Sequence, residues 1–328
     1  MHGQYSDTTG AVPTLSRWKP NPAGRILASL PGVPETMNLA VRVFPWDQFG
    51  GAGTSQGATA LADVVREIRR DAQREQQPCR THTLRDRLHI QELAFTQPQH
   101  CRTWRERGRR WFRRTLQRHS FILWLGGNHL SVLPVLEELP PQTLVLQFDA
   151  HLDIHDFDDT LDTLSHGNYW RFLPQPRPSA IHLGHRDLFV PPEESRRYFT
   201  AVYSALDITT RLADVTADLQ RQVSQASRVW IDIDVDVFDP ALCPAVQHPL
   251  PFGLTSAAFW PLWQAVWSEK VLGVSLSEFD PGRDVRDQSL HMLGWFLEHL
   301  LLQAAQCQPM SAAEPEPSRR NDGTKPSG

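Results

Sequence analysis

The chain of 328 residues carries 33 basic and 37 acidic side chains, so its formal net charge of −4 gives no general attraction to nucleic acid or to an anionic membrane. A hydrophobic fraction of 40% and a charged fraction of 21% are ordinary for a soluble globular protein, and the length is sufficient to bury a large core. The four cysteines are scattered without a CxxC pair, and the sequence shows neither a secretory signal nor an apolar run that spans a bilayer. These features predict a cytoplasmic protein without a disulfide framework.

The composition divides the chain into three parts. Residues 1–37 are rich in Pro, Gly, Ser and Thr without a clear period, and they are predicted to form an irregular arm. Residues 308–328 are polar, rich in Pro and almost free of large apolar side chains, which predicts a disordered tail. Because neither a linker nor an internal repeat interrupts the sequence between them, residues 38–307 are expected to form one domain.

Short β-rich runs alternate with helical patterns through this domain. Strands are predicted, in chain order, at 39–44, 121–125, 143–148, 181–183, 228–233 and 271–276. Helices are predicted from the helical spacing of apolar residues at 58–68, 212–226, 256–267 and 290–301. Strands that alternate with helices predict an α/β fold with a mainly parallel sheet that is covered on both faces.

One segment is rich in arginine. Residues 102–118 hold eight arginines interleaved with Trp104, Trp111 and Phe112. We interpret the segment as an amphipathic surface helix with an arginine face and an aromatic underside. A nucleic-acid site usually belongs to a basic domain, whereas this chain is slightly acidic, so that function is disfavoured. An anion-binding or subunit-contact face stays open as an alternative.

Four polar clusters each begin where a predicted strand ends. They are Gly126 to His129, Asp149 to Asp153, Asp232 to Asp236 with the following Asp239-Pro240, and Ser277 to Pro281. In open parallel α/β sheets, ligands bind outside the carboxyl ends of the strands. We therefore expect all four clusters to converge on one crevice.

Two of these clusters alternate acidic and histidine side chains with apolar ones. In an extended segment, alternate side chains point to the same face. Two trios are therefore expected to share a face: Asp149, His151 and Asp153, and Asp232, Asp234 and Asp236. Several carboxylates lie together only at a high cost in free energy unless a cation neutralises them. Aspartates with a few histidines suit divalent ions such as Mn²⁺, and this many ligands predict two ions that lower the pKa of a shared water.

Each motif taken alone has a simpler interpretation. The cluster at 149–153 is compatible with surface acids beside a core histidine, and the cluster at 126–129 with a turn before a helix. The cluster at 232–236 is compatible with a single Ca²⁺ or Mg²⁺ site, or with aspartates that cap a helix. Because the motifs occur together at predicted strand ends, a dinuclear metal site is favoured.

The order of the four motifs resembles that of the ureohydrolases, the family of arginase, agmatinase and formiminoglutamase. The resemblance extends from about Pro45 to the last predicted helix. It implies a three-layer α/β/α fold and assembly into homo-oligomers, either trimers or hexamers. It also implies a hydrolase that cleaves a guanidino C–N bond to give urea and an amine. The family uses two divalent metal ions, for which Mn²⁺ is the expectation and Ni²⁺, Fe²⁺ or Co²⁺ suit the same ligands.

The resemblance implies a complete set of metal ligands. One ion is expected at His129, Asp149, Asp153 and Asp234. The other is expected at Asp149, His151, Asp234 and Asp236, so that Asp149 and Asp234 bridge the pair. The residue at 232, where this chain has Asp, is usually Ser in the family.

The resemblance also implies the roles of residues that act on the substrate. Glu278 matches the glutamate that pairs with the substrate's guanidinium. Asp236 is implied to relay a proton to the leaving amine, and His166 matches the histidine assigned to proton shuttling. A solvated loop histidine is the alternative interpretation of His166. His155, in an acidic loop over residues 154–165, is predicted to bind substrate.

Several positions depart from the family's pattern. Asn128 stands where Asp is commoner, and residues 246–249 replace the usual stretch with Gly-Thr. Phe189 occupies the place where arginase has an aspartate for the α-amino group of arginine. The acidic loop also suits a cationic or neutral substrate tail better than an α-carboxylate. An agmatinase-like substrate or another guanidino compound is therefore expected in place of arginine. Two alternatives stay open, a formiminoglutamase-type amidine hydrolase and a non-catalytic metal-binding homologue.

Overall fold

The structure is a computed structural model that describes residues 38–76, 83–155 and 163–306. The predicted N-terminal arm and C-terminal tail lie outside these residues, as does the part of the acidic loop at 156–162. The predicted division of the chain into arm, domain and tail therefore stays a prediction.

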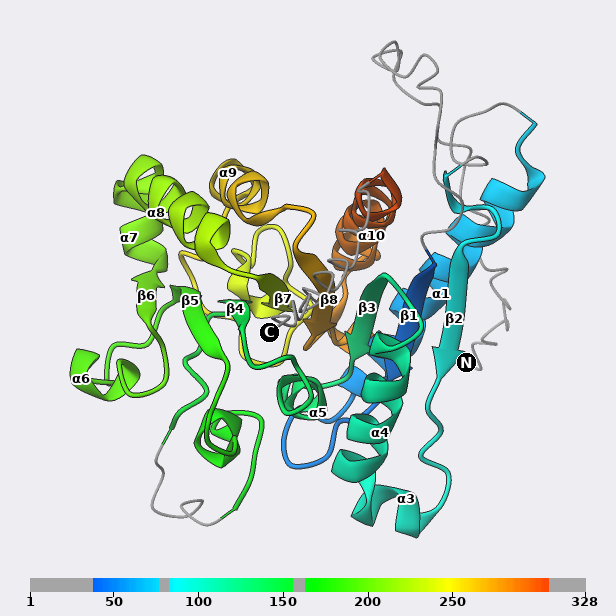
Figure 1. Ribbon diagram of the computed structural model, residues 1–328, viewed down its shortest axis with the longest axis horizontal. Helices are drawn as coiled ribbons and strands as arrows, with labels where there is room; N and C mark the ends of the chain where they lie inside the picture. The colour runs from blue at the N-terminus through cyan, green and yellow to red at the C-terminus, as the bar shows by residue number, and fades with distance from the viewer. Residues whose placement is uncertain (1–37, 77–82, 156–162, 307–328) are drawn as a thin grey trace, which may run out of the picture. The chain divides into compact units, whose positions relative to one another are not determined.

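A parallel sheet of eight strands organises the described residues, with the strand order β2-β1-β3-β8-β7-β4-β5-β6 (Figure 1). The strands are β1 (Leu39–Phe44), β2 (Leu88–Glu92), β3 (Phe121–Gly126), β4 (Thr143–Phe148), β5 (Ser179–His185), β6 (Ala201–Ser204), β7 (Arg228–Asp234) and β8 (Val271–Ser277). All six predicted strands are present within a few residues of their predicted bounds. The strands at the two edges of the sheet, β2 and β6, were not predicted.

Helices cover both faces of the sheet, so the expected three-layer α/β/α fold is confirmed. The helices are α1 (Thr54–Arg74), α3 (Pro98–Arg102), α4 (Trp104–Leu116), α5 (Leu133–Leu136), α6 (Pro192–Ser195), α7 (Ala205–Thr210), α8 (Leu212–Gln225), α9 (Ser256–Val266) and α10 (Gln288–Gln306). Figure 1 shows α8, α9 and α10 on one side of the sheet and α4 and α5 on the other. The buried face of α1 packs in the same cluster as those of α8, α9 and α10.

Alternate residues of each central strand pack into two hydrophobic cores, one on each face of the sheet. In β3, Phe121, Leu123 and Leu125 pack toward α1 and α10, whereas Ile122 and Trp124 pack in the core on the side of α4 and α5. All five are buried, which is the continuous apolar run that a parallel strand covered on both faces requires. Because both faces of the sheet are covered, polar side chains that bind a ligand are expected at the ends of its strands.

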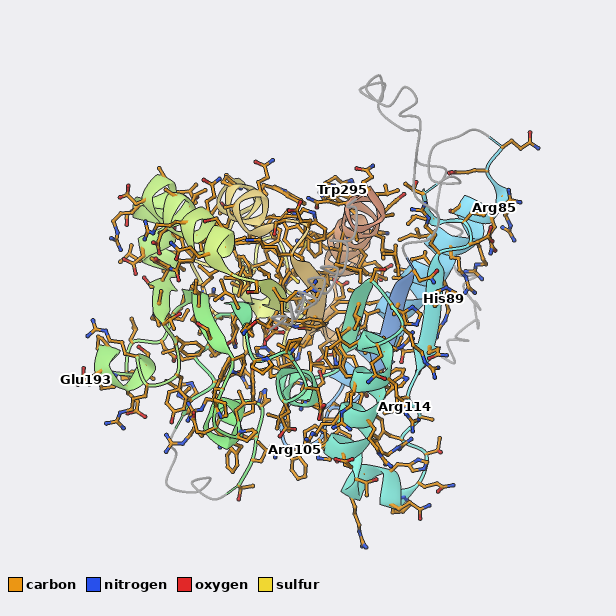
Figure 2. All side chains as sticks on the ribbon, viewed as in Figure 1. Arg85, His89, Arg105, Arg114, Glu193 and Trp295 are labelled. Atoms are coloured by element: carbon orange, nitrogen blue, oxygen red, sulfur yellow. The ribbon has the colours of Figure 1, made fainter. Side chains whose placement is uncertain are left out.

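The arginine-rich segment forms the amphipathic helix that was predicted. Its underside buries Trp104 and Phe112. Three of its arginines, Arg105, Arg109 and Arg113, pair with the two glutamates that directly follow α5. Arg105, labelled in Figure 2, donates to Glu137 over 2.6 Å, and Arg113 donates to Glu138 over 2.7 Å. These pairs give part of the arginine face a structural partner within the domain. Within the described part of the chain, the helices lack the combination of length and apolar character needed to cross a membrane.

Candidate metal centre

The four polar motifs lie at the carboxyl ends of four neighbouring strands at the centre of the sheet. His129 begins the 3-10 helix η1 (His129–Val132) after β3, and Asp149 comes directly after β4. Asp234 is the last residue of β7, and Glu278 comes directly after β8. Because the central order is β3-β8-β7-β4, the carboxyl ends of these strands lie side by side. The predicted convergence of the four motifs is confirmed.

Three carboxylates surround one nitrogen of His129. The distances from His129 Nδ1 are 2.7 Å to Asp153 Oδ2, 3.1 Å to Asp149 Oδ2 and 3.3 Å to Asp234 Oδ2. All four residues are buried. Ligand atoms of His129, Asp149 and Asp234 all lie within 4.8 Å of one another, a spacing that suits one metal ion.

A second group of possible ligands shares Asp149 with the first. Its members Asp149, His151 and Asp236 also offer atoms within 4.8 Å of one another. His151 Nδ1 lies 2.9 Å from Asp236 Oδ2 and 3.8 Å from Asp149 Oδ1. The two oxygens of Asp149 therefore face different histidines, Oδ2 toward His129 and Oδ1 toward His151, as a bridging carboxylate would.

The chemistry of these residues fits divalent cations. His129 Nδ1 and Asp153 Oδ2 are buried and have no hydrogen-bond partner among the described residues, an arrangement that is costly unless a further group occupies the space. Burial raises the pKa of Asp149 to about 7, with a further rise from the charge of Asp153. Burial and the charge of Asp236 likewise raise the pKa of Asp234 well above its usual range. A divalent cation would neutralise these carboxylates and give both orphaned atoms a partner.

Turns, and not extended strands, bring the ligands together. The expectation that alternation along an extended segment orients them is wrong beyond Phe148 and Asp234, because β4 and β7 end there. Asp149 Oδ1 accepts a hydrogen bond of 2.7 Å from the backbone N–H of His151, and Asp153 has a left-handed φ of 52°. Asp234 Oδ1 accepts from the backbone N–H of Asp236 over 2.9 Å, at the start of the 3-10 helix η3 (Val235–Val237). Local side chain to backbone bonds therefore fix the carboxylates of Asp149 and Asp234.

Glu278 contacts His129, the histidine of the first group of candidate ligands. Its side chain is 6% exposed, and Oε1 accepts a hydrogen bond of 2.7 Å from the backbone N–H of His129. The backbone of Glu278 has a φ of 68°, held by a 2.8 Å bond from its N–H to the carbonyl of Gly127. A non-glycine residue in this conformation costs free energy and persists only where its surroundings enforce it. The loop thus holds a buried carboxylate at the edge of the metal centre.

His166 reaches Glu278 from a separate loop. Its Nδ1 lies 3.1 Å from Glu278 Oε1, and its side chain is 24% exposed. Burial lowers the pKa of His166, but the hydrogen bond and the charge of Glu278 outweigh burial and raise it. Gly50, with a φ of +117°, leaves room for this ring, since a Cβ there would lie 2.2 Å from His166 Cδ2. The structure brings His166 to the same site as Glu278, at the boundary with solvent.

His155 lies at the rim and not in either group of candidate ligands among the described residues. Its Nε2 is 3.5 Å from Asp187 Oδ2, and its backbone N–H donates to the carbonyl of Gly167 over 3.1 Å. Asp187 also accepts a 3.0 Å bond from the backbone N–H of Leu152, next to the ligand cluster. The predicted contact of His155 with substrate stays a prediction.

The sequence analysis missed one residue of the site and the function of another. His248, an exposed residue in the segment that departs from the family's pattern, has its ring 6.5 Å from that of His151 and 6.1 Å from that of His166. Asp232, noted as a departure from the Ser that is usual in the family, is fully buried with Oδ2 at 2.9 Å from His129 Nε2. Both positions depart from the family's pattern, which was the available sign of a special role. Where their side chains point depends on tertiary structure, which the sequence pattern does not give.

Comparison with protein families supports the resemblance. The family model described as the arginase family matches residues 38–302. A putative agmatinase 3 of Schizosaccharomyces pombe is 30% identical over 183 residues, which cover 51% of this chain and 45% of that protein. An agmatinase of Serratia proteamaculans is 28% identical over 189 residues, 56% of this chain and 60% of the relative. The matched region therefore spans about half of the length of these curated relatives.

Solved structures share the fold at low sequence identity. A proclavaminate amidino hydrolase from Streptomyces clavuligerus superposes with a TM-score of 0.66 at 19% identity, covering 84% of this chain and 94% of that one. A formimidoylglutamase from Bacillus subtilis superposes with a TM-score of 0.63 at 18% identity, covering 83% and 88%. At this identity the two structures bear on the fold alone.

Proposed function

The chain belongs to the arginase family, and we propose that it is a metal-dependent hydrolase that cleaves a guanidino C–N bond to give urea and an amine. One observation carries the proposal. Two groups of candidate metal ligands share Asp149, and the buried carboxylate of Glu278 lies against His129, a member of the first group. A pair of metal sites beside an acceptor for a cation is the arrangement that hydrolysis of a guanidinium requires.

We assign two divalent ions to the centre, with Mn²⁺ as the family's expectation. His129, Asp149, Asp153 and Asp234 would hold one ion. Asp149, His151, Asp234 and Asp236 would hold the other. Bound ions would supply a water activated near neutral pH and would stabilise the negative charge that develops in the reaction.

The protein's own groups orient the substrate and move protons. Glu278 presents a carboxylate that is fixed by the backbone N–H of His129 and suits a planar guanidinium. Asp236 would pass a proton to the leaving amine, and its position is held by His151 at 2.9 Å. His166, partly exposed and 3.1 Å from Glu278, would exchange protons between the site and solvent.

An agmatinase-like substrate, or another guanidino compound, is favoured over arginine by exposed residues that are close in sequence to Asp187 and His248. Phe189, where arginase has an aspartate, is 94% exposed, and the adjacent Leu188 is 88% exposed. Phe252, in the loop that carries His248, is 84% exposed. These apolar side chains offer no charge to an α-amino or α-carboxylate group. His155, whose Nε2 lies 3.5 Å from Asp187 Oδ2, would contact the substrate's distal end.

Assembly and compartment are proposed from the resemblance. We expect a homo-oligomer, either a trimer or a hexamer, that acts on a small molecule in the cytoplasm. Size-exclusion chromatography with light scattering tests the first of these expectations directly.

A urea-release assay on protein loaded with Mn²⁺ or Ni²⁺ tests the proposed function. The substrates are agmatine, arginine, guanidinobutyrate, guanidinopropionate and guanidine, with Asp149→Asn and Glu278→Ala as controls. Urea from one substrate, lost in both variants, supports the proposal and identifies the substrate. Protein that carries two ions but releases no urea contradicts it, and formamide from formiminoglutamate would then identify an amidine hydrolase.

A further inference from the structure

A row of polar side chains crosses the sheet beneath the metal centre. His182, Gln147, Asp232 and Ser275 occupy the same register on the neighbouring strands β5, β4, β7 and β8. Their exposed fractions are between 0% and 1%. Elsewhere these central strands are almost continuously apolar, so a polar row at this depth needs partners that stabilise it.

Three members of the row each hold one candidate metal ligand. His182 Nε2 donates to the carbonyl of His151 over 2.7 Å, and Gln147 Nε2 donates to Asp149 Oδ2 over 2.9 Å. Asp232 Oδ2 lies 2.9 Å from His129 Nε2. Among the three, Asp232 is the only one that contacts the imidazole ring of a candidate ligand.

The direction of each hydrogen bond around Asp232 follows from the groups involved. Trp230 Nε1 can only donate, so Ser275 Oγ accepts from it over 3.0 Å. Ser275 Oγ then donates to Asp232 Oδ1 over 2.5 Å. Asp232 Oδ2, a carboxylate oxygen, accepts from the Nε2–H of His129. This order leaves the lone pair of His129 on Nδ1, the atom that faces Asp149, Asp153 and Asp234.

Tyr169 is the competing partner for the same nitrogen. Its hydroxyl lies 3.2 Å from His129 Nε2 and accepts from Gln147 Nε2 over 3.2 Å. A neutral hydroxyl at this distance is a weaker acceptor than a carboxylate at 2.9 Å. The two candidates can be separated by mutation, because Tyr169 does not belong to the row.

We propose that Asp232 is a positioning residue that fixes the ring and tautomer of His129 and thereby strengthens the binding of the ion held by His129. The proposal rests on the metal centre of the proposed function. A carboxylate that accepts from the remote nitrogen of a ligating histidine orients the ring and makes it a better ligand. His151, the histidine of the other ion, is held by His182 through its backbone carbonyl, and among the described residues no member of the row contacts its ring. The two ions should therefore respond differently when Asp232 is changed.

The test is a titration of metal-free protein with Mn²⁺ alone, followed by calorimetry and by elemental analysis of bound ions. Wild-type protein should bind two ions. Asp232→Asn and Asp232→Ser should bind one ion about 10- to 100-fold more weakly and the other with unchanged affinity. Asp284→Asn, which changes an aspartate that caps α10, is the matched control and should bind both ions as the wild-type does. In a His151→Asn background, Asp232→Asn should weaken the single remaining ion.

Two outcomes would overturn the proposal. One is wild-type affinity for both ions in Asp232→Asn and Asp232→Ser. The other is a loss in Tyr169→Phe that the Asp232 variants do not show. If the Asp232 variants do not fold, Ser275→Ala keeps the carboxylate but removes its donor, and unchanged affinity in that variant would also overturn the proposal. A protein that binds two ions with the predicted asymmetry but hydrolyses no substrate would contradict the proposed function and leave the role of Asp232 standing.

Discussion

His129 Nδ1 and Asp153 Oδ2 lie 2.7 Å apart in the interior, and neither atom has a hydrogen-bond partner among the described residues. Two buried polar atoms that face each other in this way are expensive unless a third group binds both. Asp149 and Asp234 add two further carboxylates within 3.3 Å of the same nitrogen. The protein should therefore be most stable when cations fill this space.

We expect Mn²⁺ to raise the melting temperature of the metal-free protein. An ion that binds only the folded state adds about 2.7 kcal/mol of stability at 100 times its Kd. Asp149→Asn should abolish the shift, because Asp149 belongs to both groups of ligands. Thermal melts with and without a chelator measure the effect, with Asp284→Asn as a control that keeps it. A wild-type protein whose melting temperature ignores the metal would rule out the centre.

The same variant should stabilise the metal-free protein at neutral pH. Burial raises the folded-state pKa of Asp149 from 3.8 to about 7. A raised pKa means that the folded state binds more protons than the unfolded state, so this group lowers stability as the pH rises from about 4 to about 7. Asn removes that cost. If metal-free Asp149→Asn has a lower melting temperature than the wild-type at pH 8, the buried charge of Asp149 does not destabilise the folded protein.

Metal binding should release protons. The hydrogen bond and charge of Asp236 overcome burial and raise the pKa of His151 from 6.5 to about 10 in the metal-free protein, and the pKa of His129 is raised as well. His151 is therefore protonated at pH 7.5 and must lose a proton to become a ligand. Addition of Mn²⁺ in weak buffer with a pH indicator should release roughly one proton from His151. Apparent affinity should rise with pH and level off near pH 10. His151→Asn should release fewer protons, whereas an unchanged count would contradict the assignment of His151.

The sequence predicted the centre of the sheet well because each central strand is a continuous apolar run that ends at a polar motif. The edge strands escaped prediction for a physical reason. Only one of the five residues of β2 is buried, and the residues of β6 are all half-buried, so neither shows the pattern of a covered strand.

The candidate metal ligands could be predicted from the sequence, but the residues that contact and orient these ligands could not. The contact of Asp232 with His129 depends on the register between β7 and its neighbours, which no local pattern encodes. The position of His248 depends on how its loop folds over His151 and His166. Motif spacing therefore identified the candidate metal ligands, whereas tertiary structure determines which residues orient them.

Glu278→Gln should lower kcat/KM for a guanidino substrate roughly 30- to 5000-fold, which corresponds to a loss of about 2–5 kcal/mol of transition-state stabilisation. Gln keeps the size of the side chain and can still accept from the backbone N–H of His129, but it removes the charge that pairs with the substrate. Steady-state urea release measures the change, and the bound metal should stay at the wild-type level. Glu193→Gln, on the surface of α6 (Figure 2), should leave kcat/KM unchanged. Loss of metal in Glu278→Gln would instead make Glu278 part of the metal site.

Gly57→Ala should destabilise the protein and displace the loop that carries Glu278. A Cβ at Gly57 of α1 would lie 1.8 Å from the carbonyl oxygen of Phe279, the residue that follows Glu278. Because this contact is with backbone, the loop or the helix must move, at a cost of about 1–3 kcal/mol or more. We expect a lower melting temperature and a lower kcat/KM in the same variant, since Glu278 would lose its alignment with His129.

The matched control for that change is Gly294→Ala in α10. Among the described residues, a Cβ there would meet only Val64 Cγ1, at 3.3 Å, the end of a side chain that can shift. Alanine also favours a helix over glycine by about 1 kcal/mol, so this variant should be as stable as the wild-type or more stable, with unchanged kcat/KM. Equal melting temperatures for Gly57→Ala and the wild-type would show that the loop bearing Glu278 does not rest on α1. A stability loss in Gly57→Ala with full kcat/KM would show that the loop yields without moving the carboxylate.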